Sequence, residues 1–157
     1  MLKIHSCDPN NNAELISDII KCIDCKFNDY YWHILDLEIT ANDREDYIYN
    51  KPLFSERVLS FQKQVDDEHG VYIKKNLLLK ILFESRTIYR GVFSCFNNGT
   101  GKLASYSSSV ENTSGQEMPT DVVFEMRILD GDLIFIKSKN SDVLNFIKEN
   151  FSEYIQE

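Results

Sequence analysis

The sequence predicts an α+β domain in which helices near the start, the middle and the end of the chain pack on one antiparallel β-sheet. Three patterns lead to this prediction: apolar residues at helical spacing, alternation of apolar and polar residues, and apolar arms joined by a turn signal. Because arms joined by a short turn become antiparallel neighbours, we expect an antiparallel sheet with helices packed on it. All 157 residues, 1 to 157, are expected to form a single domain, since no boundary or repeat interrupts them.

The clearest pattern is a β-hairpin in the second half of the chain. Its arms run from Val122 to Leu129 and from Leu133 to Ile136, around the pair Asp130-Gly131. An Asp-Gly pair between apolar runs favours a type I′ turn, because that turn requires positive φ at both central residues. These arms are therefore expected to form neighbouring strands of the sheet.

Three stretches show the spacing of amphipathic helices. The first follows Asn12, a suitable N-cap, and ends near Cys25. The second starts after Pro52, and the third follows Ser141 as its N-cap. The stripes that define them are Leu15, Ile16, Ile19, Ile20 and Ile23, then Phe54, Val58, Phe61, Gln62 and Val65, and finally Val143, Leu144, Ile147, Phe151, Tyr154 and Ile155.

A strand is predicted between Tyr30 and Ile39, where side chains alternate with a period of two. One face is expected to be the core face; it consists of Tyr31, His33, Leu35, Leu37 and Ile39. The other face is expected to project from the sheet; it consists of Trp32, Ile34, Asp36 and Glu38.

The leucine run from Leu77 to Phe83 has no period that separates helix from strand, and we expect it to pair as a second hairpin with the β-rich segment Ile88 to Phe96. Residues 97 to 120 are rich in Asn, Gly, Ser and Thr and exceed the usual length of a connection. That stretch is expected to be mobile, functional, or to contain a short strand around Lys102 to Val110.

The charge distribution is uneven. The net charge is −8. Up to Ile73 the chain has 14 acidic and seven basic residues, and from Lys74 onward it has 11 acidic and ten basic residues. An acidic surface repels phosphate, so direct nucleic-acid binding is not expected and a basic protein partner is favoured, unless the charge serves solubility alone. Without a membrane-spanning run or a secretion signal, the expected location is cytoplasmic.

No sequence motif indicates an enzyme, and no cofactor is expected. The pair Cys22 and Cys25 matches C-x-x-C, but it lies at the C-terminal end of a predicted helix, where the dipole disfavours a reactive thiolate, and idle thiols are favoured over a metal site. A metal-dependent nuclease could be built from Asp121, Glu125 and Arg127, although the arginine stands where such sites carry lysine.

The candidate partner-binding residues combine one aromatic side chain with carboxylates in the first half of the chain. They are Trp32, Asp36, Glu38, Asp43, Glu45, Asp46, Asp66, Asp67 and Glu68. Paired carboxylates of this kind can also bind a divalent metal or act as acid and base, or simply form a solvated face. A docking surface is the third interpretation, in which the tryptophan supplies apolar area and the acids supply charge complementarity.

The chain resembles the immunity proteins of bacterial toxin systems, including contact-dependent growth inhibition. The resemblance is carried by the stretches Cys22 to Ile39 and His69 to Asn76, together with size and acidity. It implies a cytosolic protein that binds a cognate toxin domain, often a basic nuclease, and occludes its active site. These proteins share no motif, so the resemblance assigns no role to any residue. The alternative is a small-molecule binding or regulatory domain in which residues 97–120 form a lid.

Overall fold

The computed structural model describes residues 1–24, 30–42, 55–96 and 118–155, and it contains an antiparallel sheet of six strands together with four α-helices. The predicted α+β class is confirmed. The strands are β1 (Leu2–His5), β2 (Tyr31–Ala41), β3 (Val71–Lys74), β4 (Ser85–Phe96), β5 (Val122–Leu129) and β6 (Leu133–Ser138). The helices are α1 (Ala13–Asp24), α2 (Glu56–Glu68), α3 (Lys75–Phe83) and α4 (Ser141–Asn150), followed by the 3-10 turn Ser152–Tyr154.

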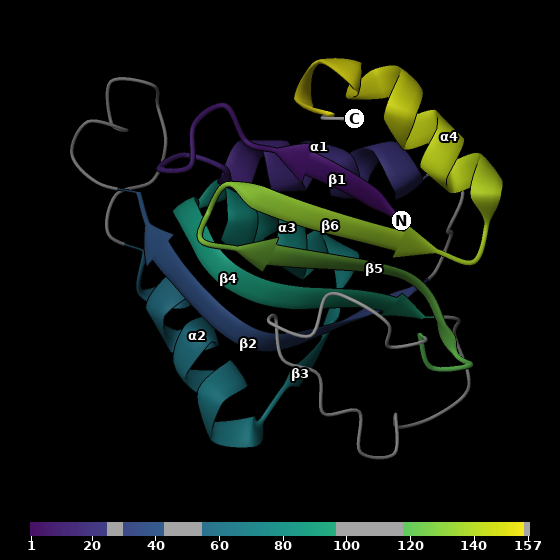
Figure 1. Ribbon diagram of the computed structural model, residues 1–157. Helices are drawn as coiled ribbons and strands as arrows, with labels where there is room; N and C mark the ends of the chain where they lie inside the picture. Colours follow the sequence, from purple (N-terminus) through teal and green to yellow (C-terminus); the bar gives the residue numbers. More distant parts are fainter. Residues whose placement is uncertain (25–29, 43–54, 97–117, 156–157) are drawn as a thin grey trace.

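The strands follow the order β1-β6-β5-β4-β2-β3 across the sheet. Helices α1, α3 and α4 lie on one side of this sheet, as Figure 1 shows, while α2 runs along the edge of β2. Helix α1 contacts both α4 and α3, and α3 contacts α2, so the helical layer follows the order α4, α1, α3, α2. None of the described helices has both the length and the apolar character needed to cross a lipid bilayer.

One large apolar core fills the space between the sheet and these helices. The predicted hairpin β5–β6 is confirmed and lies inside the sheet. Asp130 and Gly131 have φ values of 54° and 77°, as the turn signal requires. Leu129 pairs with Leu133, so three residues form the connection instead of the two of a type I′ turn. On the opposite face, the described residues form a small apolar cluster of Leu35, Val92 and Leu129.

The leucine run was predicted to be a strand, and this prediction is wrong: it forms α3. Its buried side chains are Leu78, Ile81 and Leu82, which recur at helical spacing, whereas Leu77 and Phe83 are exposed. The burial of three positions and the exposure of two match a helix lying on a core. A strand in this stretch would have exposed alternate residues instead.

The faces assigned to β2 are also corrected. Asp36 has a φ of 48°, and the pairing of β2 with β4 shifts register just after Leu35. A bulge of this kind moves the following side chains to the other face of the sheet. Trp32 and Ile34 therefore point into the same core as Leu37 and Ile39, and His33 lies on the opposite face.

The predicted N-caps of the first and last helices are corrected as well. Asn140, not Ser141, caps α4, and its side chain accepts a hydrogen bond from the Asp142 amide. Asn12 does precede α1, but its side chain bonds to the sheet instead of to the helix. Pro52 lies outside the described residues; the second helix begins at Glu56.

Candidate functional site

The residues predicted to bind a partner are found in three places. Asp43, Glu45 and Asp46 lie outside the described residues. Trp32 is only 3% exposed and packs edge to face on Phe124, with ring centroids 6.0 Å apart, so it contributes to the core and not to a surface. The remaining acids lie on β2 and at the end of α2.

The two acids of β2 lie close to one arginine of β4. Arg90 Nη2 donates to Asp36 Oδ2 at 2.7 Å, and both side chains remain about one-third exposed. Glu38 stands directly opposite Arg90 in the strand pairing and is exposed. The guanidinium of Arg90 therefore partly neutralises Asp36, and Glu38 lies across from the same arginine in the strand pairing.

Helix α2 carries the other acids at its C-terminal end. Asp66, Asp67 and Glu68 are all exposed, and Lys63 pairs with Asp67 one turn earlier. The helix ends at His69, whose φ of 54° terminates it in the left-handed conformation. Negative charges in the last turn interact unfavourably with the helix dipole, so these three acids do not stabilise the helix.

One hydrogen bond brings these two acidic segments together. Gln62 Oε1 accepts a hydrogen bond from the backbone N–H of Ile39 at 2.8 Å, which fastens α2 along the edge of β2. Leu59 lies three residues before Gln62 and Asp66 lies four residues after it, so all three share one flank of the helix. That flank therefore borders β2 next to Glu38.

Leu59 is the apolar residue that the sequence analysis missed. It is 58% exposed, and of the large apolar residues in the described segments only Met1 is more exposed. We call Glu38, Leu59 and Asp66 the α2 flank. The signal in the sequence was a leucine on the polar side of a helix whose core positions are Val58, Phe61 and Val65.

A second group of polar side chains crosses the sheet on the face opposite the helices. Ser94 of β4 stands directly opposite His33 of β2 on one side and Glu125 of β5 on the other. We call His33, Ser94 and Glu125 the polar row. Directly opposite residues have Cβ atoms about 5 Å apart, so the Ser94 side chain is a neighbour of both His33 and Glu125.

All members of the polar row are buried. Arg127 Nε donates to Glu125 Oε1 at 2.7 Å, and this ion pair is almost completely removed from solvent. Among the described residues, the Ser94 hydroxyl and His33 Nδ1 have no hydrogen-bond partner. Burial without a compensating partner lowers the pKa of His33, because it disfavours the charged imidazolium.

The geometry limits the chemistry of both groups. Glu125 and Arg127, two of the three residues considered for a metal-dependent nuclease, bind each other in the interior instead of presenting free ligands. No group of three His, Cys, Asp or Glu side chains within the described segments is placed to hold a metal ion. Cys22 is half-buried, and its C-x-x-C partner Cys25 lies outside those segments.

Comparisons with models of protein families, with curated proteins and with solved structures found no match.

Proposed function

We propose that this protein is an immunity protein that binds a cognate toxin domain, a basic nuclease, and neutralises it by covering its active site. The observation that carries the proposal is Leu59, a large apolar side chain exposed on a flank that also presents Glu38 and Asp66. An apolar anchor surrounded by charges is the usual arrangement of an energetically important interface centre.

The charges of this flank fit a basic partner. A nuclease must bind phosphate groups and therefore presents a basic cleft, to which carboxylates are complementary. Asp36, Asp67 and Glu68 extend the acidic surface on the same two elements. The sequence between β2 and α2 also contains Asp43, Glu45 and Asp46.

The proposal is tested first by neutralisation. The chain is co-expressed with the toxin domain encoded by the preceding open reading frame, and host growth is measured. Restored growth, with recovery of a complex that dissociates only under denaturing conditions, supports the proposal. Death of the cells, despite soluble expression of both chains, contradicts it.

The binding surface is tested separately with purified chains. Leu59→Asp should accelerate dissociation because it removes the apolar anchor, and Glu38→Lys should slow association and flatten its dependence on salt. Leu77→Asp is the matched control, since Leu77 is an exposed leucine on α3. If Leu59→Asp and Glu38→Lys both neutralise the toxin as well as the wild type, the proposed function stands but the α2 flank is not the binding surface.

A second candidate function is supported by the polar row. The unpartnered Ser94 hydroxyl and His33 Nδ1 are buried side by side, and such atoms are often satisfied by a bound polar molecule. The test is a screen of small polar compounds by amide chemical shifts, in which changes confined to β2 and β4 and abolished in Ser94→Val support a ligand. A screen with no such changes contradicts this candidate.

A further inference from the structure

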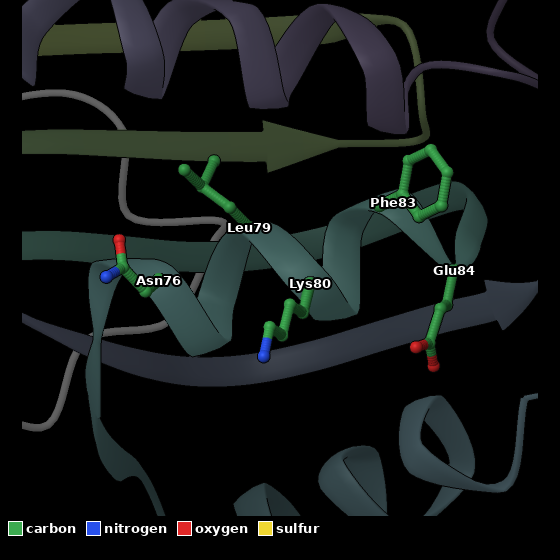
Figure 2. Close-up of a pocket in the computed structure, with 5 residues that line it drawn as sticks. All are labelled: Asn76, Leu79, Lys80, Phe83 and Glu84. Atoms are coloured by element: carbon green, nitrogen blue, oxygen red, sulfur yellow. The ribbon is translucent and has the colours of Figure 1, made fainter.

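A groove of about 430 Å³ lies on the outer face of α3. Among the residues that the structure describes, those that line it belong to this helix or follow it directly; they are Asn76, Leu79, Lys80, Phe83 and Glu84. Figure 2 shows Leu79 and Phe83 on the side that faces α1, and Lys80 and Glu84 on the side that faces α2. We call this hollow the α3 groove.

The apolar part of the α3 groove is a short helical stripe. Leu79 and Phe83 are one turn apart, and Phe83 is 57% exposed although it follows the buried Leu82. A phenylalanine this exposed loses the free energy that its burial would provide, so it is a poor choice for the fold alone. The stripe therefore offers an apolar surface for another element to cover.

The charges around this stripe differ in sign from those of the other helices. Helix α3 contains Lys75 and Lys80 and no acidic residue. Each of the other three described helices contains more acidic than basic residues. Helix α3 is thus the basic helix of an acidic protein.

The one carboxylate of the groove is already engaged. Arg57 Nη1 donates to Glu84 Oε1 at 2.8 Å, and the Ser55 hydroxyl donates to Glu84 Oε2. Its charge is therefore balanced within the chain. Lys80, which lines the groove beside the Leu79 and Phe83 stripe, therefore gives the potential there a positive sign.

From this combination we infer that the α3 groove binds an amphipathic helix that carries apolar residues one turn apart and acidic residues on its flanks. The apolar residues of that helix cover Leu79 and Phe83, and its carboxylates meet Lys80. This is the helix-in-groove mode of recognition. It is independent of the proposed toxin binding, because it uses a different face with the opposite charge.

The inference is tested with two synthetic helical peptides that share the same leucine spacing and differ only in having glutamates or lysines on their flanks. The glutamate peptide should shift the amide resonances of residues 75–84 and bind about two- to fivefold more tightly than the lysine peptide, the range of an exposed charge pair. Lys80→Glu should reduce or reverse this preference. Phe83→Ser should reduce the affinity for the glutamate peptide by about tenfold or more.

Leu59→Ser is the matched control, because Leu59 is exposed to the same extent on α2 and should not affect peptide binding. Equal binding of the two peptides, or shifts outside α3, would overturn the inference. It would also be overturned if wild-type protein alone sedimented as a dimer that Phe83→Ser dissociates, since a second copy would then occupy the groove.

Discussion

Two buried polar regions of this protein are built in opposite ways. Asn12 is fully buried, and its amide group donates to the carbonyls of Ile88 and Gly131 at 2.8 and 2.6 Å while accepting from the Ile88 N–H at 2.8 Å. In the polar row, by contrast, Ser94 and His33 keep buried atoms without a partner among the described residues. A satisfied polar group specifies a fold, and an unsatisfied one costs stability, so only the first is explained by folding.

The largest effect expected from this comparison follows from Asn12→Ala. The substitution leaves one N–H and two carbonyl groups without their partner in the interior, and it should lower the free energy of unfolding by about 3 kcal/mol. Urea denaturation measures this change. Asn10→Ala, on the exposed part of the same loop, is the control and should change stability little. A small loss in Asn12→Ala would show that the bonds of Asn12 do not hold the loop on the sheet.

The next effect concerns Gly70, which packs against the polar row. Its φ is 120°, and a Cβ added there would lie 2.6 Å from Leu35 Cδ2 and 2.8 Å from His33 Nε2. Gly70→Ala should therefore cost about 2 kcal/mol through strain and overpacking. In a His33→Ala background the loss should be smaller, because one of the two obstructing side chains is absent. Equal losses in both backgrounds would mean that the backbone angle alone is responsible.

A smaller effect, with the opposite sign, is expected at Ser94. Ser94→Ala removes a buried hydroxyl that has no described partner, and it should leave stability unchanged or raise it by about 1 kcal/mol. Ser85→Ala is the matched control on the same strand, since the Ser85 hydroxyl donates to the Ile81 carbonyl at 2.6 Å and its loss should destabilise. If both variants lost stability equally, the contrast between satisfied and unsatisfied groups would fail.

The smallest effect is a change in pH dependence. Burial lowers the pKa of His33 in the folded protein, so near pH 6 the unfolded chain binds more protons than the folded one. Above the unfolded pKa of 6.5, neutral His33 does not reduce the free energy of unfolding. As the pH falls below that value, protonation favours the unfolded chain and the free energy of unfolding decreases. His33→Gln should flatten the dependence of stability on pH between pH 7 and pH 5. A curve unchanged in His33→Gln would assign the dependence to other groups.

The elements that could be predicted from the sequence are those whose signals are local. The Asp130-Gly131 turn and the apolar arms beside it determine a hairpin without reference to the rest of the chain. The spacing of Ile16, Ile19 and Ile23 does the same for α1. Local patterns of this kind are sufficient to predict an element when the preferences of its own residues agree with the structure that the whole fold requires.

The missed features depend on contacts that are distant in sequence. The bulge at Asp36 forms where β2 pairs with β4, which lies more than 50 residues later in the sequence. The alternation of residues in β2 alone does not indicate that Trp32 faces the core. Helix α3 was missed because a short apolar run fits either period, and its two neighbours α1 and α2 decide the outcome. The α2 flank required the bond between Gln62 and Ile39, which joins segments 23 residues apart.

The pairing of β1 with β6 has a consequence for the order in which the protein is made. Leu2 pairs with Ile136, and Ile4 forms a further bridge with Ile155, so β1 is paired by segments that follow it far along the chain. During synthesis β1 leaves the ribosome long before its partners exist. Closing so long a loop is slow, and β1 cannot join the sheet until β6 has been synthesised. A ribosome that stalls before β6 would therefore release a chain whose first strand has nothing to pair with.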